Sequence, residues 1–148
     1  MVFNSVSDME AYLLNKIDEA VYAAGELVYE KADEKLAEFY AEYKPDYYKR
    51  TNQLRDNTLL FKPVKSTRRG AEVEVGYTDQ AGIHYDHGNT ALTVYNSMMG
   101  DYPHGGWEPA GGEPIFDKLL IDLFELGYAD YALERGMRYA GIPIESKF

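Results

Sequence analysis

A long run of regularly spaced apolar residues near the N-terminus constrains the fold of this 148-residue chain more than any other feature. Between Met9 and Tyr43 these residues recur every three or four positions, which places them along one side of an α-helix. They are Met9, Leu13, Ile17, Ala20, Val21, Ala24, Leu27, Val28, Ala32, Leu36, Phe39 and Tyr43. Pro45 ends the pattern, because proline has no backbone N–H and disfavours the α conformation in the residue before it. The pattern predicts one long helix of about ten turns within residues 1–44.

Two positions refine this predicted helix. Ser7 and Glu10 have the spacing of a capping box, which predicts that Ser7 caps the start of the helix. Gly25 is the expected weak point, because glycine inside a helix costs about 1 kcal/mol relative to alanine. Tyrosines 12, 22, 29 and 40 are expected to be partly buried flanks of the apolar stripe.

A β-hairpin is expected after the helix. The segments LLFKPVKST (59–67) and AEVEVGYT (71–78) are typical of strands, and Arg68, Arg69 and Gly70 form the turn between them. The second segment alternates cleanly, with apolar residues at 71, 73, 75 and 77 and glutamates at 72 and 74. Pro63 cannot donate a ladder hydrogen bond, so the first strand is predicted to be an edge strand or to carry a bulge.

The second half of the chain divides into a loop and a helical region. Residues 81–90 could supply a third short strand, and 91–99 fit a helix or a strand equally well. Residues 91–114 are predicted to form a Gly/Pro-rich loop, because five glycines and three prolines fall between positions 100 and 114. Apolar periodicity returns in 115–142, where Gly127 could divide two helices and Gly141 with Pro143 ends the second.

These elements predict a single α+β domain over residues 1–148. Its long N-terminal helix and C-terminal helix pack on a small, mainly antiparallel β-sheet. The basic loop and hairpin region occupies residues 45–90. No stretch resembles a signal peptide or a membrane span, so no contact with a membrane is expected.

Charge is distributed unevenly along the chain. The formal net charge is −10, yet residues 44–69 contain eight basic and two acidic residues. The rest of the chain then holds 7 basic and 23 acidic residues. An acidic body repels free nucleic acid, so a basic strip on it favours an acidic protein partner, including another copy of the chain. At most transient contact with nucleic acid is expected.

No catalytic motif is recognisable. The chain has no cysteine, none of its serines lies in a G-x-S-x-G elbow, and its glycines match no nucleotide-binding loop. His84, Asp86 and His87 are close in sequence, but positions 84 and 87 would point to opposite faces of a strand. We therefore expect no enzyme activity, no cofactor and no metal. A metal-dependent hydrolase built on these three residues is an alternative function, ranked below the two that are introduced next.

The segment YKPDYYKRTNQLRDN (43–57) resembles the signature of phage head–tail joining, or tail-completion, proteins of siphophages and prophages. The residues that carry the resemblance are Tyr43, Pro45, Tyr48, Arg50, Thr51 and Leu54, with Asn57 where serine is frequent. The order of elements is also similar: a long helix, a hairpin, a turn like HYDHGNT (84–90) and a proline-led C-terminal helix. The 100–114 loop and the stretch beyond Gly127 are longer than this pattern.

The resemblance implies a structural role in the virion neck, after a period in the host cytoplasm. Such proteins form rings with copies of themselves and join connector and tail proteins. The residues predicted for the interface are Tyr48, Lys49, Arg50, Thr51, Arg55, Arg68 and Arg69. Two roles stay open for the basic segment: a contact between subunits, or a staple between helix and hairpin within one subunit. The alternative function is a small DNA-associated protein that uses residues 44–69.

Overall fold

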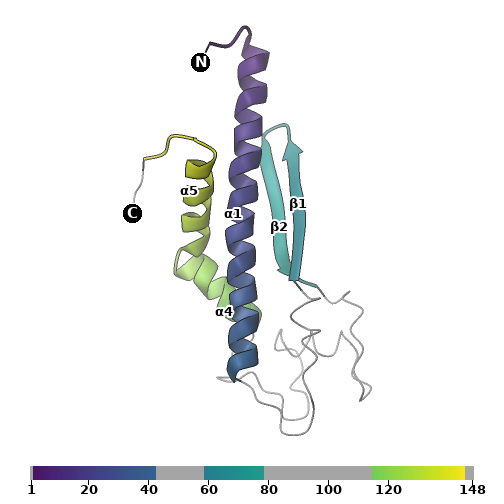
Figure 1. Ribbon diagram of the computed structural model, residues 1–148, viewed down its shortest axis with the longest axis vertical. Coiled ribbons are helices and arrows are strands. Elements are labelled where there is room, and N and C mark those ends of the chain that lie inside the picture. The colour runs from purple at the N-terminus through teal and green to yellow at the C-terminus, as the bar shows by residue number, and fades with distance from the viewer. Residues whose placement is uncertain (1, 43–58, 79–114, 146–148) are drawn as a thin grey trace.

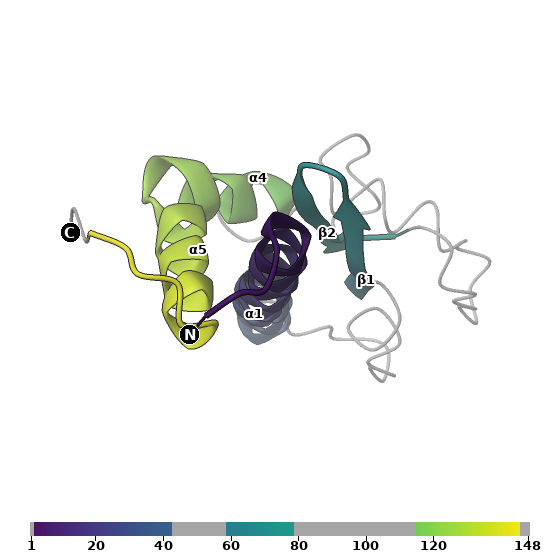
Figure 2. The ribbon, with the colours of Figure 1, turned by 90° about the horizontal axis from the view of Figure 1, so that it is seen from above.

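A long helix forms the middle layer of the molecule. The computed structural model describes residues 2–42, 59–78 and 115–145. Helix α1 (Val6–Glu42) lies between a β-hairpin on one side and the C-terminal helices on the other, as the two perpendicular views show (Figures 1 and 2). The predicted α+β class, with a long N-terminal helix, a C-terminal helix and a small antiparallel sheet, is confirmed, and α1 is the helix that packs directly on the sheet.

The start of α1 differs from the prediction by two residues. The helix begins at Val6, and the Ser5 hydroxyl accepts a hydrogen bond from the Asp8 N–H at 3.1 Å. Ser5 is therefore the N-cap residue, and Asp8 adds a negative charge to the first turn, where the helix dipole favours it. The prediction of Ser7 as the N-cap was wrong. Ser5 and Ser7 are both followed three residues later by an acidic side chain, so this spacing alone does not distinguish them.

Helix α1 is continuous across Gly25. The hairpin packs directly against the helix at this residue. A Cβ atom at this position would lie 2.9 Å from Val73 and 3.2 Å from Phe61. The missing side chain thus lets β1 and β2 approach the helix backbone closely. The intrinsic cost of glycine in the helix is offset by this packing.

The hairpin consists of β1 (Leu59–Thr67) and β2 (Gly70–Tyr77), which pair antiparallel. The register shifts by one residue between Lys62 and Lys65, so that Pro63 and Val64 together oppose Val73. This irregularity confirms the bulge predicted from Pro63. The inner face of β2 ends at Tyr77, whose buried hydroxyl donates a hydrogen bond to the Ala32 carbonyl at 2.9 Å. Burial raises the pKa of this phenol, so it stays protonated in the folded chain.

The C-terminal region packs on the opposite side of α1. Helix α4 (Ile115–Leu120) continues into one π-helical turn, η1 (Ile121–Glu125), and Gly127, with a φ of 74°, separates this turn from α5 (Tyr128–Tyr139). Gly141, also with a φ of 74°, follows the end of α5, so both predicted glycine boundaries are confirmed. Ala132 and Gly136 of α5 and its C-cap residue Ala140 form a buried stripe, and a Cβ at Gly136 would lie 2.1 Å from the Ala20 carbonyl oxygen.

A charged cluster joins η1 to α1. The carboxylate of Asp122 accepts ion pairs from Lys35 at 2.9 Å and from Lys31 at 3.4 Å. Partial burial alone would raise the pKa of Asp122, but the hydrogen bond and charge of Lys35, together with those of Lys31, hold it below its usual value. The cluster therefore fixes the position of η1 along α1.

Several predictions fall on other parts of the chain. The basic loop 45–58, the third strand within 81–90 and the Gly/Pro-rich loop 91–114 lie outside the described residues. Among the described helices, none is both long enough and apolar enough to cross a bilayer.

Candidate interaction surface

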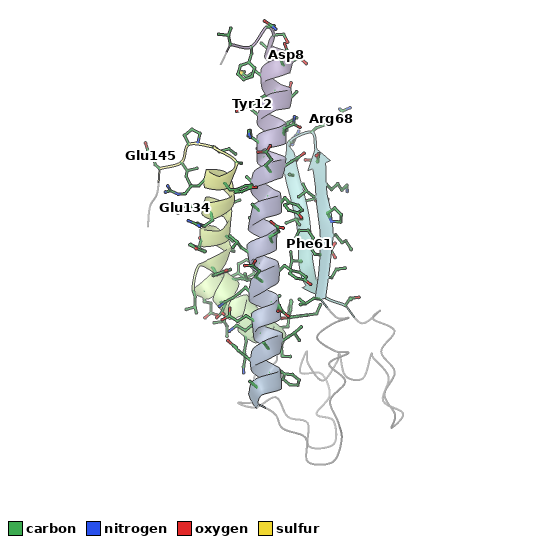
Figure 3. All side chains as sticks on the ribbon, in the orientation of Figure 1. Asp8, Tyr12, Phe61, Arg68, Glu134 and Glu145 are labelled. Carbon is green, nitrogen blue, oxygen red and sulfur yellow. The ribbon has the colours of Figure 1, made fainter. Side chains whose placement is uncertain are left out.

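The turn of the hairpin presents two exposed arginines. Arg68 and Arg69 lie at the tip, and Figure 3 shows Arg68 directed away from α1. The Thr67 hydroxyl shapes the turn, because it accepts a hydrogen bond from the Arg69 N–H at 3.3 Å and donates one to the Gly70 carbonyl at 3.0 Å. Neither guanidinium forms an ion pair with another residue of the segments 2–42, 59–78 and 115–145.

The other cations of the hairpin are neutralised across the strands. Lys62 pairs with Glu74 at 2.8 Å, and Lys65 pairs with Glu72 at 3.3 Å. These exposed pairs add little stability, but they remove most of the positive potential that the two lysines would otherwise project. The positive charge of the described hairpin is therefore concentrated at its tip.

A contact near the tip ties the hairpin to α1. The Ser66 hydroxyl hydrogen-bonds one carboxylate oxygen of Asp18. The other oxygen, Oδ1, is buried and has no hydrogen-bond partner among the atoms of the described residues. This hydrogen bond links the end of the hairpin to the helix, while Arg68 projects away from α1 at the tip (Figure 3).

A shallow aromatic hollow lies farther along α1, where the helix meets β1. Its volume is about 330 Å³, and it is open to solvent. Its lining residues are Tyr22, Glu26, Tyr29, Glu30 and Phe61. We call this feature the aromatic–acidic hollow.

The geometry of the hollow follows from helix periodicity and one inserted ring. Positions 22, 26, 29 and 30 share one face of α1, because residues four, seven and eight apart lie nearly above one another. Phe61 of β1 packs against both tyrosines, with ring centroids 5.6 Å from Tyr22 and 6.0 Å from Tyr29 and ring planes nearly perpendicular. Such edge-to-face pairs hold the rings in place.

The carboxylates give the hollow a negative potential. Glu26 lies beside the Tyr22 hydroxyl, and its charge and hydrogen bond raise the pKa of that phenol. Glu26 and Glu30 are exposed, and neither forms an ion pair with another residue that the structure describes. Aromatic faces beside carboxylates form a surface that favours a cation.

The structure describes two of the predicted interface residues, Arg68 and Arg69, and both are exposed. The other five lie outside the described residues: Tyr48, Lys49, Arg50, Thr51 and Arg55. The same holds for His84, Asp86 and His87. Within residues 2–42, 59–78 and 115–145, no group of three His, Asp or Glu side chains could hold a metal ion.

Sequence reasoning missed the aromatic–acidic hollow. The spacing of Tyr22, Glu26, Tyr29 and Glu30 was visible, but the tyrosines were interpreted as the flank of a buried stripe. Tyr22 is 45% exposed and Tyr29 is half-buried, which agrees with partly buried flanks but did not indicate a hollow between them. Nothing local to Phe61 indicated that it would lie between them.

No protein-family model, curated protein or solved structure matches this chain. The resemblance to head–tail joining proteins therefore stays a prediction from the motif of residues 43–57.

Proposed function

We propose that this chain is a structural component of a phage or prophage virion that completes the tail or joins it to the head. It acts in the neck through assembly with other proteins and needs no cofactor. Its partners are other copies of itself, arranged in a ring, and the connector and tail proteins on either side. Before assembly it resides in the host cytoplasm.

The observation that carries this proposal is the separation of charge between two elements. Helix α1 holds ten acidic residues against three lysines, a net charge of −7. The hairpin beside it ends in the exposed Arg68 and Arg69. A ring needs two different, complementary surfaces on every subunit, and these two elements supply opposite charges on separate parts of one subunit.

The pairing of Lys62 and Lys65 bears on the DNA-associated alternative. Binding to a polyanion strengthens with each phosphate that a free cation neutralises. Because Glu72 and Glu74 already compensate these lysines, the described hairpin offers a duplex little beyond its two terminal arginines. A tight, salt-sensitive gel shift with duplex DNA at physiological ionic strength would favour that alternative over the neck role.

Deletion of the gene from the phage or prophage that encodes it tests the proposal. We expect induced cells to contain DNA-filled heads and complete tails that are not joined, visible by negative-stain electron microscopy. Expression of the chain in trans should restore joined particles. Joined, infectious particles in the deletion strain would contradict the proposed role.

A further inference from the structure

The aromatic–acidic hollow has the chemistry of a guanidinium site. An arginine is planar, stacks on aromatic rings and donates paired hydrogen bonds to carboxylates. Tyr22, Tyr29 and Phe61 provide the rings, and Glu26 and Glu30 provide two acceptors on the same face of α1. The hollow is too open to enclose a small molecule, but it suits a side chain presented by a protruding segment.

The hairpin turn is the described segment that matches the hollow. It presents two adjacent arginines, both exposed and free of ion pairs within the described parts of the chain. Arg135 on α5 is also exposed, but it is a single cation on a helix rather than a pair at a protruding tip. The turn therefore complements the hollow in charge and is presented at a protruding tip.

The turn cannot occupy the hollow of its own subunit. Phe61 and Thr67 are six residues apart along β1, which corresponds to about 20 Å of extended strand. Figure 3 shows Phe61 between the hairpin and α1, and Arg68 at the far tip. A contact between turn and hollow must therefore join two molecules.

We propose that the aromatic–acidic hollow of one copy binds the Arg68–Arg69 turn of a second copy. The contact is heterologous, so each bound copy still has one free turn or one free hollow and can add a further subunit. This inference rests on the proposed assembly function and names the surfaces that would carry it.

A charge exchange between two variants tests the contact. The turn variant carries Arg68→Glu and Arg69→Glu, and the hollow variant carries Glu26→Lys and Glu30→Lys. Each alone places like charges across the contact, so we expect its self-association, measured by sedimentation velocity, to weaken at least about tenfold. An equimolar mixture should regain association, because the acidic turn fits the basic hollow and the native turn fits the native hollow.

Matched controls separate this effect from net charge and from unfolding. Arg135→Glu and Glu10→Lys change exposed charges elsewhere and should leave association unchanged. Circular dichroism should show every variant folded, because all six substituted positions are exposed. If the lysine substitutions disturb α1, the double variant Glu26→Gln and Glu30→Gln removes the two negative charges without adding positive ones. This variant should still weaken association.

Disulfide trapping extends the test to weak association, because the chain has no cysteine of its own. Arg69→Cys mixed with Glu30→Cys should give a crosslinked dimer under mild oxidation, and Arg69→Cys mixed with Glu10→Cys should not. Unchanged association of both charge variants, no recovery on mixing, or no selective crosslink would overturn the contact. The neck role would survive that result, since the gene deletion tests it independently.

Discussion

At the scale of single residues, small side chains decide how closely the layers approach. Gly25 admits Val73 and Phe61 against one side of α1, and Gly136 admits the backbone of Ala20 against α5. Both glycines lie inside helices, where propensity alone would favour alanine. Their presence is explained by contact distance rather than by local conformation.

Gly136→Ala tests this explanation. Its Cβ would lie 2.1 Å from a backbone oxygen and 3.1 Å from the Ala24 nitrogen, neither of which can move without the helix. We expect the free energy of unfolding to fall by about 1–3 kcal/mol, as measured by urea denaturation. Helix propensity alone predicts the opposite, a gain of about 1 kcal/mol.

Arg135→Ala is the matched control, because it lies next to Gly136 on the exposed side of α5 and should change stability by less than about 0.5 kcal/mol. A Gly136→Ala protein as stable as wild type would show that α5 does not pack on α1 at the distance described.

At the scale of elements, the sequence predicted what depends on local pattern. The alternation from Ala71 to Tyr77 predicted β2, and Pro63 predicted the irregularity of β1, because both effects arise within one strand. The cap of α1 was misplaced, since two serines satisfied the same spacing. The joining of η1 to α1 by Asp122 was not predicted, because Lys31 and Lys35 are about ninety residues away and local pattern carries no such information.

The Asp122 cluster predicts a pH dependence of stability. Because the pKa of Asp122 is lowered in the folded chain, its carboxylate contributes stability above the unfolded value of about 4 and loses it as pH falls through the lower folded value. Asp122→Asn should therefore reduce the free energy of unfolding at pH 7 by about 1 kcal/mol, and this difference should shrink below pH of about 4.

Glu145→Gln, at an exposed position beyond the end of α5, serves as the control and should have little effect at either pH. The same loss for Asp122→Asn at pH 3 and pH 7 would show that the lysine contacts do not hold η1 to α1. Chemical denaturation at several pH values measures both variants.

At the scale of the whole molecule, the uneven distribution of charge was predicted from the sequence, but the aromatic–acidic hollow that complements the basic turn was not. The basic stretch 44–69 led to the prediction of Arg68 and Arg69 as interface residues, and both are exposed. The hollow that matches them needs Phe61 from β1 between two tyrosines of α1, an arrangement that exists only after the hairpin packs on the helix. Sequence reasoning finds charged strips more readily than the concave surfaces that receive them.

The composition of purified particles tests the central claim, a structural place in the virion, most directly. Particles banded on a density gradient can be analysed by quantitative mass spectrometry for peptides of this chain. We expect these peptides in joined particles at one fixed ratio to the connector protein, as a ring of constant size requires. Their absence from washed particles, with the chain recovered only in the free lysate, would contradict the account.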